Sequence, residues 1–108
     1  MTDDRELLEL AARAAGYSVR AVSGYEQGGT VSFYMEPSQL YWNPLTDDGD
    51  ALRLAVCLRL KIELKTNHLY VIDDESGLVI AQAYIDDPYA ATRRAIVRAA
   101  AALGKGMK

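Results

Sequence analysis

The segment that most limits what this chain can fold into is an alternation of apolar and charged residues that begins at residue 58. The apolar members are Leu58, Leu60, Ile62 and Leu64, and the charged ones between them are Arg59, Lys61, Glu63 and Lys65. Because successive side chains of a strand point to opposite faces, this pattern predicts a strand with Ile62 in the core and Lys61 in water. The turn sequences "TNH" and "DESG" each lead into another β-prone segment, so residues 59 to 85 are predicted to form an antiparallel meander of three strands.

Helices are predicted at the two ends of the sequence. The first occupies "TDDRELLELAARAAG", which either Thr2 or Asp3 can cap. Asp3 has the spacing of a capping box, and Gly16 suits a left-handed helix end. The last runs through "YAATRRAIVRAAAALG". It follows Asp87 and Pro88, an N-cap with proline at the first helical position, and is predicted to end at Gly104.

Two β-prone segments follow the first helix. "YSVRAVSG" and "TVSFYM" are separated by "YEQGG", which predicts a hairpin with a flexible loop. Pro37 ends regular pairing, and "QLYWNP" is a short extended segment before Pro44. With a central helix after this segment, the predicted order is helix, two strands, helix, three strands, helix. We therefore expect one α+β domain over residues 1–108, mainly an antiparallel β-sheet with three helices, layered as a helix/sheet/helix sandwich.

Composition and charge exclude several classes of protein. The chain has 108 residues, half of them apolar and a quarter charged, which is typical of one folded domain. Its apolar stretches are far shorter than the roughly 20 residues that cross a bilayer, and its N-terminus is acidic, so we expect a cytoplasmic protein that does not bind membranes. A net charge of −3 does not favour nucleic acid. The single cysteine, Cys57, allows neither an internal disulfide nor a thiolate zinc cluster, and is predicted to be half-buried.

The acidic stretch "WNPLTDDGDALRLAV" has three interpretations: a metal loop, a catalytic carboxylate pair, or a helix start. An EF-hand loop with Gly49 at its sixth position would begin at Pro44 and end at Ala55, and neither supplies a side-chain oxygen ligand. The same letters "TDD" also open the first helix, which favours helix capping by Asp47 or Asp48. A metal or catalytic role remains the lesser alternative, and no catalytic, cofactor-binding or metal-binding residue is predicted.

Few other residues suggest chemistry. His68 is the only histidine and lies in a predicted hairpin turn, where a turn role is favoured over that of a general base. Five of the aromatic residues gather within residues 25–42, and core packing is the first interpretation of them. Alternation along a strand nevertheless cannot send all of them to one face. Tyr34, Tyr41 and Trp42 are therefore the predicted partner-binding residues, for an unidentified protein or a second copy of this chain.

A nucleic-acid site is the alternative. Arg93, Arg94 and Arg98 form the most basic surface of the sequence, and helical spacing puts Arg94 and Arg98 on one face. Strands followed by such a helix are similar to double-stranded RNA-binding domains. Those domains place lysines at the start of this helix, whereas Asp86 and Asp87 stand here, so binding is predicted to be weak.

Three segments carry a resemblance to a known family. "ELLELAARAAG", "LYWNPLTDDGDALRLAV" and "AATRRAIVRAAAALG" together resemble the small phage and prophage proteins grouped as the phage ABA-sandwich domain, and more distantly the NinX-type phage proteins. The resemblance implies a phage or prophage origin and a layered helix/sheet/helix domain, and it implies no activity or functional residues. The expected function is that of a non-enzymatic accessory protein that binds another protein; a weak nucleic-acid-binding module and, last, a small enzyme or metal-dependent protein are the alternatives.

Overall fold

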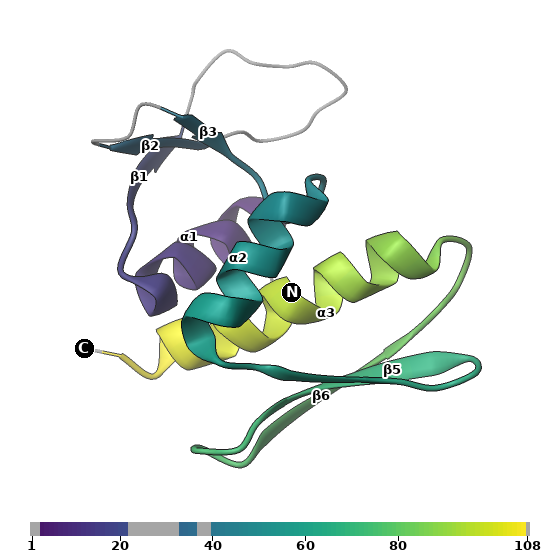
Figure 1. The fold of residues 1–108 in the computed structure, drawn as a ribbon. Helices are drawn as coiled ribbons and strands as arrows, with labels where there is room; N and C mark the ends of the chain where they lie inside the picture. Colours follow the sequence, from purple (N-terminus) through teal and green to yellow (C-terminus); the bar gives the residue numbers. More distant parts are fainter. Residues whose placement is uncertain (1–2, 22–32, 37–39, 108) are drawn as a thin grey trace.

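The computed structural model describes residues 3–21, 33–36 and 40–107. It has an α+β fold, as the sequence predicts, in which three helices lie between two antiparallel sheets (Figure 1). The elements in chain order are α1 (Asp4–Ala15), β1 (Ser18–Ala21), β2 (Phe33–Glu36), β3 (Leu40–Trp42), α2 (Asp48–Leu58), β4 (Lys61–Leu64), β5 (His68–Asp73), β6 (Leu78–Ala83) and α3 (Pro88–Lys105). Within these described ranges, no helix is long and apolar enough to cross a membrane.

The predicted meander is confirmed as the sheet β4-β5-β6, with both strand pairs antiparallel. In its centre, Val71 pairs with Ile62 on one side and with Ile80 on the other. Burial alternates along β5, where Leu69 and Val71 are fully buried. The helix α3 lies over this face and contacts β5 and β6 (Figure 1).

The first half of the alternating pattern was assigned to the wrong element. Leu58 is the last residue of α2, Arg59 is its C-cap, and β4 begins only at Lys61. Leu58 fits both periods, because it also lies three and four residues after Ala55 and Leu54 on the buried side of α2. Ile62 is half-buried and packs against the core, as predicted, with Lys61 exposed.

The N-terminal strands form a second sheet, β1-β2-β3. The predicted pairing of the first two segments is confirmed, with Val19 opposite Met35, while the loop "YEQGG" lies outside the described residues. The extended segment before Pro44 is itself a strand, β3, so the order contains one strand more than predicted. The layering also differs from the expected sandwich, because all three helices lie on the same side of β4-β5-β6 (Figure 1).

An aspartate caps the N-terminus of each helix in the described residues, and Asp3 and Asp47 are the caps where the sequence allowed two candidates each. Backbone N–H groups donate to Asp3 (2.9 Å), Asp47 (2.8 Å) and Asp87 (2.9 Å). At the other end of α1, Gly16 adopts the predicted left-handed conformation (φ 76°). Each helix start is therefore fixed by a side chain that satisfies an otherwise unpaired donor.

The core is centred on the contact between α1 and α3, which is built from small side chains. The buried residues of α1 are Leu8, Ala11 and Ala12, and those of α3 include Ala95, Ala99, Ala100, Ala101 and Gly104, of which Gly104 lies against Leu10 of α1. Gly104 was predicted to end α3, but the helix continues to Lys105 and is capped by Gly106. A Cβ atom at Gly104 would overlap the backbone carbonyl of Leu10, so this glycine is set by the close approach of two helices.

We expect Gly104→Ala to destabilise the fold by about 1–3 kcal/mol or more, because the added methyl group forces α1 and α3 apart. Intrinsic helix propensity alone predicts the opposite, a gain of about 1 kcal/mol. Gly106→Ala is the matched control, since a Cβ there meets its nearest atom, the carbonyl oxygen of Leu103, at an ordinary 3.7 Å. Urea unfolding followed by circular dichroism measures both. Equal stabilities would contradict the packing described for Gly104.

Arg59 ends α2 in a conformation that glycine adopts more easily. It is left-handed (φ 57°, ψ 45°), and it is the one non-glycine residue with positive φ in the described part of the chain. Its backbone N–H closes the helix on the carbonyl oxygens of Ala55 and Val56. Such a conformation costs a residue with a Cβ atom roughly 1–2 kcal/mol.

We therefore expect Arg59→Gly to be more stable than Arg59→Ala by about 1 kcal/mol, because both variants lose the guanidinium and only one keeps the Cβ atom. Chemical unfolding of dilute protein gives the comparison. An alanine variant as stable as the glycine variant would show that the left-handed cap stores no strain.

Candidate functional site

The acidic stretch before α2 forms a hydrogen-bonded turn. The side-chain oxygen of Asn43 accepts a hydrogen bond from the N–H of Leu45 (3.0 Å). The backbone carbonyl oxygen of Asn43 accepts one from the N–H of Asp47 (2.9 Å). Asp50 reaches back to accept the N–H of Asn43 (2.9 Å) and pairs with Arg53 (2.9 Å). Asp50 thus joins the start of α2 to the end of β3, and is more enclosed than the water-facing position expected for it, with its side chain 14% exposed.

Helix capping by Asp47 is confirmed, because its carboxylate accepts the N–H of Asp50 three residues on. The carboxylates are engaged with backbone N–H groups and arginines rather than turned toward a common point. Across the described ranges, no group of three or more His, Cys, Asp or Glu side chains is placed to hold a metal ion. The geometry of the stretch is accounted for by its structural role.

Replacing Asp47 by alanine should lower the free energy of unfolding by about 0.5–2 kcal/mol, since an N-terminal donor of α2 loses its acceptor. Asp74→Ala, in the exposed turn between β5 and β6, is the control and should be near neutral. Thermal melts of the wild type with millimolar calcium or EDTA should coincide. A rise of several degrees with calcium would show that the turn binds the ion.

Each of the three arginines considered for nucleic acid is bonded within the fold. Arg93 donates to the carbonyl oxygen of Leu45 (2.9 Å) and to Asp48 (2.6 Å). Arg94 pairs with Asp4 of α1 (2.9 Å). Arg98 donates to two acceptors on β6, the backbone carbonyl oxygen of Ala81 (3.1 Å) and the side-chain oxygen of Gln82 (2.8 Å). These side chains tie α3 to three different elements.

Two of the three predicted aromatic residues, Tyr41 and Trp42, lie on opposite faces of β3. Tyr41 is 66% exposed, but Trp42 is 2% exposed and packs edge-to-face on Tyr17, with ring centroids 5.6 Å apart. Trp42 therefore belongs to the core, because alternation along β3 sends it to the opposite face from Tyr41. Tyr34 pairs with Tyr41 in the strand register, and its side chain lies outside what the structure describes.

Tyr17, which packs on Trp42, is itself partly buried, and this changes the pKa of its hydroxyl group. Burial is the main cause that raises the pKa of the Tyr17 hydroxyl, and the nearby Cys57 adds to the rise. The tyrosine therefore stays neutral at physiological pH. Its ring packs edge-to-face on Trp42.

Two other single residues differ from their predicted places. His68 is the first residue of β5 and not part of the turn, and its ring lies edge-on to Tyr70 with Nε2 3.2 Å from the hydroxyl oxygen. Cys57 is exposed rather than half-buried, with its sulfur 3.8 Å from the carbonyl oxygen of Ala15. The contacts of these two side chains are thus with a tyrosine and with a backbone carbonyl oxygen, respectively.

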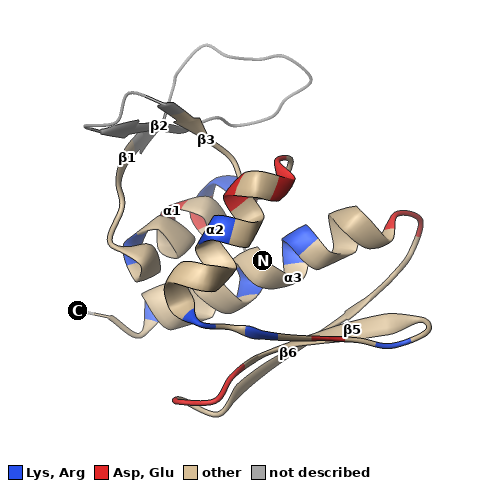
Figure 2. Cartoon of the chain, in the orientation of Figure 1, with Lys and Arg blue, Asp and Glu red and all other residues tan. Residues whose placement is uncertain are grey.

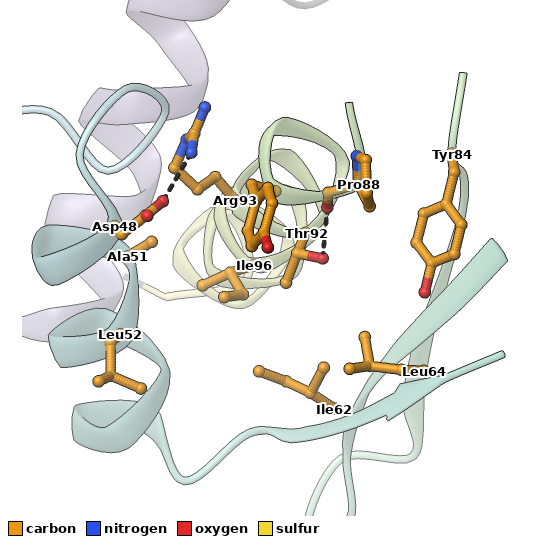
Figure 3. Close-up of a pocket in the computed structure, with 11 residues that line it drawn as sticks. Asp48, Ala51, Leu52, Ile62, Leu64, Tyr84, Pro88, Thr92, Arg93 and Ile96 are labelled. Carbon is orange, nitrogen blue, oxygen red and sulfur yellow. Dashed lines mark hydrogen bonds and ion pairs between the residues drawn. The ribbon is translucent and has the colours of Figure 1, made fainter. Parts of the chain in front are cut away.

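An apolar groove is bounded by α2, β4 and the N-terminal half of α3, and it has a volume of about 570 Å³ (Figure 3). We call it the α2–β4 groove. Its walls are Asp48, Ala51 and Leu52 from α2, Ile62 and Leu64 from β4, and Tyr89, Thr92, Arg93 and Ile96 from α3, with Tyr84 and Pro88 at one end. The groove is within the size range of ligand sites.

Large apolar side chains on the walls of the groove are open to solvent. Leu52 is 61% exposed, Leu64 65% and Tyr89 70%. The charged side chains of the walls are already paired, Asp48 with Arg93, and Thr92 donates to the carbonyl oxygen of Pro88 (2.8 Å). Acidic residues gather instead at the N-terminal ends of α2 and α3 (Figure 2). The groove thus offers apolar contact area with few unpaired polar groups.

This groove was not predicted from the sequence. Leu64 was assigned to the buried face of its strand, and Leu52 was not distinguished from the other apolar residues of the helix. The signal in the sequence is that Leu52 and Val56 lie four residues apart, off the buried side of α2 formed by Ala51, Leu54 and Ala55. Only the position of β4 relative to α2 shows that they border a concave surface.

Comparison of the chain with protein-family models, curated proteins and solved structures found no match. The resemblance to the phage ABA-sandwich family therefore stays a prediction.

Proposed function

We propose that this chain is a non-enzymatic binding protein and that it holds an amphipathic helix of a protein partner in the α2–β4 groove. The observation that carries the proposal is the exposure of Leu52, Leu64 and Tyr89 around one apolar concavity. Exposed apolar area of this kind, gathered around a hollow, is characteristic of interaction sites. Covering it removes apolar surface from water, at roughly 25 cal/mol per Å² before the costs of association.

The chemistry of the walls favours a helix as the occupant. An extended peptide brings unpaired backbone N–H and C=O groups, and burying such groups without partners is costly. The charged groups of the walls, Asp48 and Arg93, are already paired with each other. A helix satisfies its own backbone and presents a row of apolar side chains at intervals of three and four residues, which suits the groove.

The wider biological role that we propose is that of a phage or prophage accessory protein acting in the cytoplasm, and the support for it is the sequence resemblance. Nucleic-acid binding ranks below protein binding. Arg93, Arg94 and Arg98 are each bonded to carbonyl or carboxylate oxygens of the fold, and breaking those bonds reduces what a phosphate contact would contribute.

The proposal is tested by differential capture with tagged protein from cells that produce it. Leu52→Glu puts a charge into the apolar wall and should remove the captured partner from the eluate, because burying an unpaired carboxylate is strongly unfavourable. Val79→Glu on β6 is the matched control, since Val79 is 55% exposed and is not part of the groove. The control should capture as the wild type does.

A captured protein that is retained by the Leu52→Glu variant would contradict binding through the groove. Both variants must show wild-type circular dichroism and unfolding midpoints for the comparison to count. A tight, salt-sensitive complex with duplex RNA or DNA in an anisotropy assay would instead favour the nucleic-acid alternative.

A further inference from the structure

We infer that the helix that occupies the α2–β4 groove is α2 of a second copy of this chain, packed antiparallel across a two-fold axis. This inference rests on the proposed function, because it names the partner for the same groove. It makes the protein a symmetric dimer in which each copy supplies both a groove and the helix that fills its counterpart. Closed two-fold dimers are the commonest assemblies of identical chains.

The first observation is the side of α2 that faces the groove. Asp48, Leu52 and Val56 recur every four residues and so lie along one side of the helix, which we call the α2 flank, and Arg59 follows as the C-cap of the helix. Asp48 and Leu52 line the groove, and Val56, one turn further, is 67% exposed. The wall of the groove is therefore itself an amphipathic helix with uncovered apolar side chains.

The second observation is the charge at each end of this flank. Its N-terminal end carries Asp48 and its C-terminal end carries Arg59, with Leu52 and Val56 between them. When two such helices pack antiparallel about the middle of the flank, the aspartate of each lies beside the arginine of the other. Leu52 then meets Val56 of the second copy, and the apolar centre is closed at both ends by opposite charges.

The third observation concerns Arg59 itself. It adopts the left-handed conformation with a positive φ of 57°. Its side chain is exposed and makes no hydrogen bond or ion pair within the part of the chain that the structure describes. Asp48 keeps its carboxylate 73% exposed despite its pair with Arg93, so it can accept a second guanidinium. An ion pair between the guanidinium of Arg59 and a carboxylate of another chain would explain why an arginine occupies this left-handed C-cap.

Sedimentation from about 1 µM to about 1 mM protein measures the association directly. We expect a monomer–dimer equilibrium that Leu52→Glu abolishes and Val79→Glu leaves unchanged. Arg59→Gly should weaken the dimer roughly two- to thirtyfold, the effect of losing two exposed ion pairs, while the dilute monomer does not lose stability. A weaker dimer together with an undiminished monomer stability would show that Arg59 acts at the interface and not in folding.

A charge exchange gives the decisive control. Arg59→Glu alone and Asp48→Lys alone should both weaken the dimer, and the double variant should restore it, because the pairs re-form with reversed sign. Circular dichroism verifies that each variant is folded, since Asp48→Lys also loses the pair with Arg93. Arg59→Glu leaves the α3 contacts intact and is sufficient if Asp48→Lys is unstable.

A chain that remains monomeric throughout the concentration range overturns the inference. So does a dimer that is insensitive to Leu52→Glu and Arg59→Glu, because its interface is then elsewhere. If the chain is monomeric but Leu52→Glu abolishes capture of a different protein, the proposed groove function stands and only the identity of its occupant is wrong. If neither association nor capture depends on Leu52, both proposals fail.

Discussion

The close approach of α1 and α3 is the constraint on which the rest of this structure depends. Gly104 admits the backbone of Leu10 to a distance that no side chain would allow, and the alanines along both helices continue the contact. With α3 fixed on α1, its opposite side lies over β5 and β6, and its N-terminal half extends beyond α1 to form one wall of the α2–β4 groove. The arginines of α3 then fix its neighbours, through Leu45 and Asp48 near α2 and through Gln82 on β6. The concavity is what remains where α2 and β4 leave this helix uncovered.

Local signals in the sequence were sufficient for most of the elements. The aspartate caps, Pro88 and the turn residues act over a few positions, so they predicted the helix starts and the meander correctly. Leu58 and Gly104 were misassigned for a shared reason: each satisfies a local rule, strand alternation or a glycine helix end, that a tertiary contact overrides. The third strand of the first sheet was not predicted, because three residues are too few to show the alternation of apolar and polar side chains that indicates a strand.

The candidate site could not be predicted in the same way. Leu52 comes from α2 and Leu64 from β4, and nothing in their local pattern says that the two elements diverge to leave a groove. Trp42 and the three arginines were chosen by residue type together with strand and helix spacing, and in the fold Trp42 is buried while the arginines bond to neighbouring elements. Residue type and local spacing therefore do not show which side chains of such clusters the fold buries or bonds.

The contact between Leu10 and Gly104 also joins the two ends of the chain, which has a consequence for how the protein is made. On the ribosome α1 emerges first, at roughly 5–20 residues per second, and the helix that covers Leu8, Ala11 and Ala12 is the last to be synthesised. The apolar side of α1 therefore remains uncovered until α3 has been synthesised. Leu10 and Gly104 lie far apart in the sequence, so their contact closes a long loop, and the entropy lost in closing it favours slow folding of the domain.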